Sequence, residues 1–309
     1  MSLYHVTDWH FRLKNPHYRK GDYLCSLSEK LCGFADDLEE EDVVVCTGDL
    51  FDHPVVSSET LRTVVAALSR CRADWYFVIG QHDVLGHSVD AWHKCSVGVV
   101  LALPNCHLLT DEPRRIDHLN VSLRGYHWGE ADTKGWQSAN WFESDNVLRV
   151  VAIHESITAA EQVFGTTLAG TLNVDADLIL CGDIHTGLPA GTLTGNQVRI
   201  LNPGSAGRKS VDDAWRKPKA YRIDVSSTGR PTVNDHYLTD QFGEDVFRLK
   251  ESAGDKQESS DRAEWVADIQ SVSDADELPT DPEKLIDTVC EELGKPPEVA
   301  TSLKGRVLG

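Results

Sequence analysis

Acidic residues, histidines and one amide follow apolar, strand-like runs at five places along this 309-residue chain. The second run, Val43–Thr47, is rich in β-branched residues, and Gly48 breaks it just before Asp49 and Asp52. A mixed set of carboxylate and imidazole ligands suits Mn²⁺, Fe or Zn²⁺. The residues that follow the five runs are Asp8, His10, Asp49, Asp52, Gln81, His82, Asp83, His154, Asp183 and His185.

Ligands from five separate strand ends can enclose two divalent cations, with Asp49 shared between them. A cation pair lowers the pKa of a bound water, which then attacks phosphorus, and it offsets charge on the phosphoryl oxygens. This chemistry requires no covalent intermediate. The alternative is a polar, water-facing rim on a sheet. Five motifs occur along the chain in this order: D-x-H, G-D-x-x-D, G-x-H-D, a strand-end His and G-x-x-H. This ordered set favours the metal site over that alternative.

Strands and helices that alternate along the chain must position these residues, which predicts a layered α/β domain with helices outside. Apolar positions recur at helical spacing from Leu24 to Leu38, Ser57 or Ser58 can cap a second helix, and Thr158 opens a capping-box pattern for a third. Strands are predicted at Leu3–Thr7, Val43–Thr47, Trp75–Ile79, Val147–Ile153, Asp177–Cys181, Val198–Leu201 and Ala220–Val225, with shorter ones around His107–Leu109 and Val121–Gly125.

Composition predicts three parts of the chain. Residues 1–240 form the α/β domain, residues 241–262 read as a polar linker, and residues 263–309 carry two short amphipathic helices. Two short helices bury little surface alone. They dock either on their own domain or on a partner.

The formal net charge of −19 argues against a basic module that wraps nucleic acid, although bound cations can supply positive charge locally. Eight scattered cysteines form no C-x-x-C pair, and Cys46 and Cys181 lie within apolar strands. Such cysteines suit buried thiols in a reducing compartment. With no apolar run near the ~20 residues of a membrane span and no visible signal peptide, we expect a cytoplasmic protein without membrane association.

At these motifs the chain resembles the calcineurin-like metallophosphoesterases, and within them the nuclease subunit of the SbcCD type, which works with an SMC-like ATPase. The resemblance covers roughly residues 1–240 and implies a β-sandwich core with flanking helices. Its marks are Asp8-Trp9-His10, Gly48-Asp49-Leu50-Phe51-Asp52-His53, Gly80-Gln81-His82-Asp83, His154, Gly182-Asp183-Ile184-His185 and Asn202-Pro203-Gly204-Ser205.

The resemblance implies two metal positions that share Asp49. Carried over by position, the first metal takes Asp8, His10 and His185, and the second takes Gln81, His154 and Asp183. His82 matches the catalytic histidine, which orients the phosphate or protonates the leaving oxygen, and Asp83 is expected to orient that imidazole. Asp52 and His53 are expected to support the ligands from outside. Arg208 and Lys209 are candidates for contact with a nucleic-acid backbone.

Two positions depart from the family pattern, and both belong to the second metal. The family usually has Asn where this chain has Gln81, and His where it has Asp183. A carboxylate in place of an imidazole adds negative charge and a harder donor, so we expect two divalent cations, with Mn²⁺ preferred and Mg²⁺ as the alternative. The other interpretation is a site that has lost one metal and most of its activity.

The resemblance makes a DNA exonuclease or endonuclease in repair, recombination or replication the leading functional prediction. We expect DNA as substrate, an SMC-like ATPase bound through the C-terminal helices, and a possible homodimer. The additional DNA-capping domain of such nucleases is short or missing here. The alternatives are a phosphatase or small-molecule phosphodiesterase and, in another class, a weakly active scaffold that recruits the ATPase.

Overall fold

The computed structural model describes residues 1–130, 135–138, 141, 147–159, 165–226, 229–239, 241 and 243–249. The chain divides into two compact units, Met1–Arg248 and Leu249–Gly309. The first unit extends beyond the boundary expected at residue 240, because Val246 and Phe247 are buried and the Lys20 N–H donates to the Val246 carbonyl. Most of the expected linker, and all of the expected helical tail, lie outside the described residues.

A six-stranded sheet forms one layer of the first unit. Strands β1 to β4 are mutually parallel, and β12 joins them antiparallel to both β1 and β13. In spatial order the strands are β13 (Pro231–Tyr237), β12 (Lys219–Val225), β1 (Leu3–Val6), β2 (Val43–Thr47), β3 (Asp74–Val78) and β4 (Cys106–Leu108).

A five-stranded sheet forms the second layer. Its strands are parallel except β5, which pairs antiparallel with β6. In order they are β11 (Arg199–Leu201), β10 (Leu178–Cys181), β7 (Leu148–Ile153), β6 (Val121–Tyr126) and β5 (Arg114–Ile116). Two short strands, β8 (Ile157–Thr158) and β9 (Thr167–Leu168), pair separately.

The two sheets pack face to face, with β2 against β7 and β3 against β6. Successive side chains along a strand point to opposite faces of the sheet. Val43 and Val45 therefore enter the core between the sheets, whereas Val44 and Cys46 face the helices. The strands are therefore buried on both faces and read as continuous apolar runs. The predicted α/β fold with a β-sandwich core and flanking helices is confirmed.

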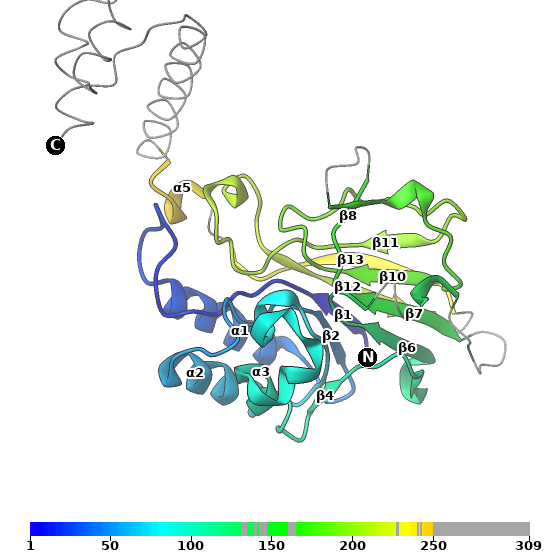
Figure 1. Ribbon diagram of the computed structural model, residues 1–309, viewed down its shortest axis with the longest axis horizontal. Helices are drawn as coiled ribbons and strands as arrows, with labels where there is room; N and C mark the ends of the chain where they lie inside the picture. Colours follow the sequence, from blue (N-terminus) through cyan, green and yellow to red (C-terminus); the bar gives the residue numbers. More distant parts are fainter. Residues whose placement is uncertain are drawn as a thin grey trace, which may run out of the picture. The chain divides into compact units, whose positions relative to one another are not determined.

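Helices α1 (Tyr23–Asp37), α2 (Ser58–Leu68) and α3 (Ser96–Val100) lie together on the outer face of the six-stranded sheet (Figure 1). Asp22 caps α1 by accepting from the Cys25 N–H at 2.8 Å, and Ser57 caps α2 through the Thr60 N–H at 3.2 Å. Both predicted helices are confirmed. A short helix, α5 (Gly243–Val246), ends the described elements of this unit.

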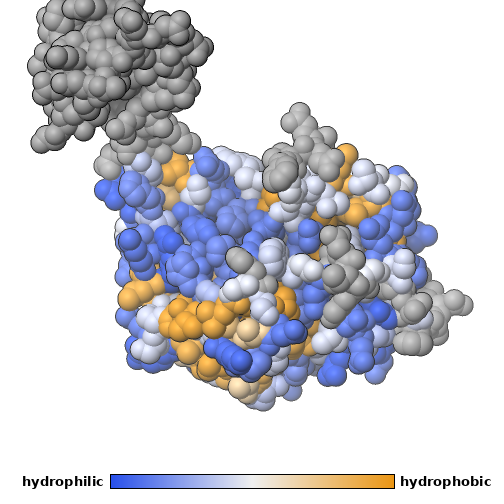
Figure 2. Space-filling view, viewed as in Figure 1, coloured by the Kyte–Doolittle hydropathy of each residue, from blue (hydrophilic) through white to orange (hydrophobic). Residues whose placement is uncertain are grey.

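One predicted helix start is wrong, because Thr158 belongs to strand β8 rather than to a cap, and residues 160–164 lie outside the described part. Strand β13 was not predicted, since Val233 is its one aliphatic residue. Among the described residues, no helix combines the length and apolar character that crossing a membrane requires. The surface in Figure 2 is mostly hydrophilic, with an apolar area around the segment that includes α3, where Leu85 and Val99 are exposed.

Candidate metal centre

The predicted ligands gather because parallel strands end at one edge of the sandwich. β1 and β2 lie side by side in one sheet, and β7 and β10 lie side by side in the other. The loops after them are bonded to each other: the Asp8 N–H donates to the Gly48 carbonyl and the Gly182 N–H to the Ile153 carbonyl, both at 3.1 Å. Nδ1 of His154, after β7, lies 2.6 Å from the Thr47 carbonyl of β2, and the His82 N–H, after β3, donates to Oδ1 of Asp49 at 3.0 Å. Five strand ends therefore meet in one place.

Several ligands sit in a backbone conformation that L-residues rarely adopt. The φ angles of Asp8, His10, Asp49 and Asp183 are +52°, +50°, +52° and +75°. Asp and His tolerate this left-handed region better than most residues, and it costs free energy that the surrounding structure must supply. The turns aim successive side chains into the same space instead of continuing the strand.

Two glycines allow the loops to approach closely. A Cβ at Gly48, whose φ is +94°, would overlap the His154 imidazole, and a Cβ at Gly80 would overlap the Asp49 carboxylate. The G-D and G-x-H-D motifs therefore carry glycine because a side chain there would displace a ligand.

The first group of ligand atoms comes from Asp8, His10 and His185. Oδ1 of Asp8 lies 3.7 Å from Nε2 of His10 and 3.7 Å from Nε2 of His185, and the two imidazole nitrogens are 2.9 Å apart. These three atoms are arranged as a metal-binding group. They are the ligands that the resemblance assigns to the first metal.

Asp49 joins this group to the second one. Its Oδ2 lies 3.7 Å from Nε2 of His10 and 3.6 Å from Nε2 of His154. His154 Nε2 is in turn 3.8 Å from Oδ1 of Asp183, which accepts a 2.6 Å hydrogen bond from the Gln81 amide. The structure thus brings all seven predicted metal ligands together, with Asp49 in the bridging place.

Four buried donor atoms of this cluster have no hydrogen-bond partner among the described residues: Asp8 Oδ1, Asp49 Oδ2, Gln81 Oε1 and His154 Nε2. The second polar atom of each of three of these side chains is satisfied. Asp8 Oδ2 accepts from Thr7, Asp49 Oδ1 from the His82 N–H, and His154 Nδ1 lies 2.6 Å from the Thr47 carbonyl.

Buried polar atoms are rarely left without a partner, because burial alone removes their hydration at a cost. The four atoms named above are oxygen or imidazole donors on predicted ligands, which is compatible with bound divalent cations. Cations bound there supply Lewis acidity and lower the pKa of water. The protein's own part is to hold the donors rigid and to present substrate to them.

The electrostatics show how strongly the cluster favours positive charge. Burial lowers the pKa of His154, but the Asp49, Asp8 and Asp183 carboxylates outweigh it and raise the pKa to about 10. Burial raises the pKa of Asp8 to about 6. Without cations the acidic cluster therefore holds protons near neutral pH, and cations must displace them.

A cationic group surrounds Asp52 beside the first metal position. Asp52 Oδ1 lies 3.3 Å from Nδ1 of His10 and accepts from Lys209 at 3.0 Å, while its Oδ2 accepts from Arg12 at 2.7 Å. Burial raises the pKa of Asp52, but His10, Arg12 and Lys209 hold it well below its usual range. Asp52 thus orients the His10 imidazole through its Nδ1 atom. The exposed His53 lies 3.6 Å from Oδ2 of Asp52.

His82 is placed where substrate can reach it. Its side chain is 40% exposed, and its Nε2 lies 4.0 Å from Oδ2 of Asp49. The expectation that Asp83 orients this imidazole is wrong: its carboxylate accepts from the N–H groups of Phe51 at 3.0 Å and Gly80 at 3.1 Å. His82 Nδ1 instead lies 3.2 Å from the Asp52 carbonyl.

Asp83 therefore ties the loop after β2 to the loop after β3. Burial raises its pKa to about 7.

The Arg208 side chain is not exposed for contact with a nucleic acid. It is fully buried, and its Nη1 donates to the carbonyls of Arg216 and Gln241, so the expected backbone contact is wrong for this residue. Lys209, whose side chain is 24% exposed, reaches the metal centre instead. Nothing in the sequence itself distinguishes Arg208 from Lys209 in this respect.

Several supporting residues were not predicted. Arg12, two positions after His10, and Ser156, two after His154, contact Asp52 and Asp183. Asn202 belongs to a quoted motif without an assigned role. Its amide donates to the Ile184 carbonyl at 3.1 Å, which fixes the loop that carries Asp183 and His185.

The carboxylate and histidine groups at this edge of the β-sandwich are compatible with bound divalent cations. Residues 1–187 match the calcineurin-like phosphoesterase family model, and the chain belongs to this family, which makes the protein a metal-dependent phosphoester hydrolase. No curated protein matched the sequence. Two similar solved structures are a crystal structure (11% identity, TM-score 0.46, covering 76% of this chain and 98% of that one) and the NAD nucleotidase NadN of Haemophilus influenzae (12% identity, TM-score 0.43, covering 77% and 50%).

Proposed function

We propose that this chain is a two-metal phosphodiesterase that hydrolyses DNA, of the SbcCD nuclease type, with Mn²⁺ as the preferred cation. The observation that carries the proposal is the convergence, next to the exposed His82, of four buried donor atoms that have no hydrogen-bond partner in the described part of the chain. His82 is suitably placed to donate a proton to the leaving oxygen, which an alkoxide leaving group requires.

The charge of the centre favours a diester over a monoester. A phosphodiester carries one negative charge, whereas a monoester carries about −1.5 to −2 at neutral pH. Asp183 adds a carboxylate where the family resemblance predicts a neutral imidazole, so the loaded centre has less positive charge to offer a dianion.

The partner and the biological setting are also proposals. An SMC-like ATPase would bind the segment of residues 263–309, which places the activity in DNA repair, recombination or replication. A homodimer is the expected assembly. These three proposals come from the family resemblance.

Parallel assays with Mn²⁺ on end-labelled duplex DNA, hairpin DNA, a cyclic nucleotide and a phosphate monoester test the activity. We expect cleavage of DNA, and a loss of about 10²- to 10⁴-fold in kcat for His82→Ala at unchanged metal content. Asp49→Ala is expected to lose both metal and activity. The exposed His53 provides the matched control, since His53→Ala removes a neighbouring imidazole that only borders Asp52. Cleavage of the monoester alone would refute the proposal.

A further inference from the structure

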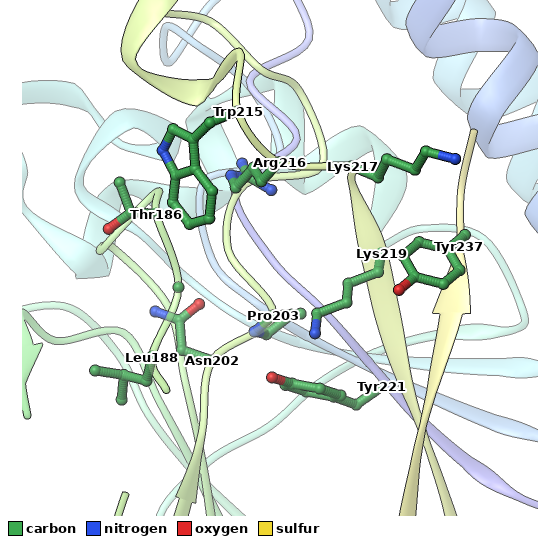
Figure 3. A pocket seen from close by; sticks show the side chains of 11 residues that line it. Thr186, Leu188, Asn202, Pro203, Trp215, Arg216, Lys217, Lys219, Tyr221 and Tyr237 are labelled. Carbon is green, nitrogen blue, oxygen red and sulfur yellow. The ribbon is translucent and has the colours of Figure 1, made fainter. Parts of the chain in front are cut away.

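A pocket of about 240 Å³ opens directly beside the loop that carries His185. Thr186 and Gly187, the next two residues, line one side of it, and Pro203 lies at its base. In Figure 3, Trp215 lies beside Thr186, whereas Lys217, Lys219 and Tyr237 of β13 line the other side of the pocket. The pocket and the metal centre therefore share one loop.

The buried guanidinium of Arg216 is the polar anchor of this pocket. Arg216 is 8% exposed; its Nη2 donates to the Ser205 carbonyl and its Nε lies 3.5 Å from Oδ1 of Asp213. Its Nη1 is buried and has no hydrogen-bond partner in the described part of the chain. Because Arg216 lines the pocket, its guanidinium contributes a fixed positive charge at the pocket wall.

Arg216 also stands close to the catalytic loops. A Cβ at Gly204 would lie 3.2 Å from its Cζ and would also overlap the His185 carbonyl, so all three groups meet at Gly204. The Ser205 N–H donates to that carbonyl at 2.9 Å. A phosphate bound on the Arg216 side of the pocket is therefore next to the loop that presents a metal ligand.

Aromatic rings and cations alternate around the pocket. Trp215 is 73% exposed and Tyr237 is 55% exposed, which is unusual for such large apolar side chains. Lys219 lies 4.7 Å from the centre of the Tyr221 ring and pairs with Asp235 at 2.9 Å. Lys217 adds a further positive charge. In a chain with a net charge of −19, this is a local site for an aromatic anion.

We propose that this pocket binds the nucleotide adjoining the scissile phosphate, with Trp215 stacked on the base and Lys217 on the flanking phosphate, beside the fixed charge of Arg216. An aromatic ring can stack on any base, and the cations contact the phosphate backbone. This site would therefore bind single-stranded DNA without sequence specificity. The pocket is too small for a duplex. This inference rests on the proposed phosphodiesterase function, and it names the part of the substrate that the metal centre itself does not hold.

Two esters with the same leaving group test the proposal: 4-nitrophenyl thymidine 5′-phosphate and methyl 4-nitrophenyl phosphate, each with Mn²⁺. We expect the wild-type protein to prefer the nucleoside ester. In Trp215→Ala the ratio of the two kcat/KM values should fall about tenfold, equivalent to about 1.4 kcal/mol. Trp215→Phe should restore most of the ratio. Lys217→Ala should raise the Kd for single-stranded DNA, which contains the flanking phosphate that neither ester has. Arg62→Ala, which removes an exposed cation on α2, is the charge control.

Binding is measured separately from hydrolysis. In a His82→Ala background, fluorescence anisotropy with a labelled single-stranded thymidine oligonucleotide should show a Kd about tenfold higher after Trp215→Ala. If both esters are cleaved but neither the ratio nor the Kd responds to Trp215→Ala, the pocket proposal fails and the phosphodiesterase stands. If neither ester is cleaved with metal bound, the phosphodiesterase fails, and the anisotropy result alone then supports or overturns the nucleotide site.

Discussion

The Gln81 side-chain amide donates a 2.6 Å hydrogen bond to Oδ1 of Asp183. These are the two positions at which the chain differs from the pattern that the family resemblance implies, and in the structure they are hydrogen-bonded partners. The carboxylate provides the acceptor, and the longer glutamine side chain reaches it while its Oε1 stays buried without a partner among the described residues. The two substitutions therefore form one unit, which supports a changed second metal site rather than two independent losses.

Gln81→Asn tests this pairing. The shorter amide cannot keep both the bond to Asp183 and the position of Oε1, so affinity for the second Mn²⁺ should fall about 10- to 100-fold, as is typical when a supporting contact is lost. Calorimetric titration of the metal-free protein should resolve two equivalents in the wild type. Gln137→Asn, in a short helical turn (Trp136–Ser138), is the matched control. A single equivalent in the wild type would instead favour the interpretation that one metal site has been lost.

Gly80→Ala should disrupt the centre through the backbone. The added Cβ would overlap both the carboxylate and the backbone nitrogen of Asp49, so the bridging ligand must move. We expect loss of bound metal and a decrease of about 1–3 kcal/mol in the free energy of unfolding, typical of an overpacked site. Metal content and urea unfolding measure the two effects.

Gly33→Ala, within α1, is the opposite case. No described residue lies within 4 Å of a Cβ at this position, and alanine favours the helix, so this variant should gain about 0.5–1 kcal/mol. Equal behaviour of the two variants would contradict the role assigned to Gly80.

The positions of the strands and of the metal ligands were predictable because each strand is a buried, apolar run that ends in a polar residue. Val43–Thr47 is the clearest example, and its predicted bounds are those of β2. The left-handed φ of Asp49 and the burial of Arg208 were not predictable, since both depend on contacts with distant parts of the chain. The same applies to Asp83, whose partners come from another loop.

Strand β13 and the pocket beside Arg216 were not predicted from the sequence, for a related reason. β13 is held by its pairing with β12 rather than by its own composition, so its sequence reads as a loop. The pocket beside Arg216 is likewise assembled from four segments. Its exposed Trp215 looks, in the sequence alone, like any other aromatic residue.

Lys209→Gln should weaken substrate binding more than it slows the reaction. Lys209 donates to Asp52 at 3.0 Å and lies 3.4 Å from Nδ1 of His10, while part of its side chain remains open to solvent. Loss of one cation beside the substrate should raise KM about fivefold, equivalent to about 1 kcal/mol, with a smaller effect on kcat. Steady-state kinetics at two salt concentrations measure it, since screening should reduce the difference from wild type. An effect on kcat alone would place Lys209 in the chemical step instead.

His5 should make the stability of the metal-free protein depend on pH. This residue is fully buried with Nε2 2.9 Å from Oγ1 of Thr47, and burial lowers its pKa to about 3. An unfolded histidine has a pKa of about 6.5, so between pH 6.5 and 3 the unfolded state binds a proton that the folded state does not. The free energy of unfolding therefore decreases by about 1.4 kcal/mol for each pH unit below 6.5.

His5→Gln keeps a hydrogen-bonding group next to Thr47 but cannot take up this proton. The wild type should consequently lose about 2 kcal/mol relative to the variant between pH 6.5 and pH 5. Urea unfolding of both proteins in the presence of a chelator measures the difference, and His93→Gln, on an exposed side chain, controls for the loss of a histidine. A difference that stays constant across this pH range would show that His5 becomes protonated in the folded state, and that its burial does not exclude the charge.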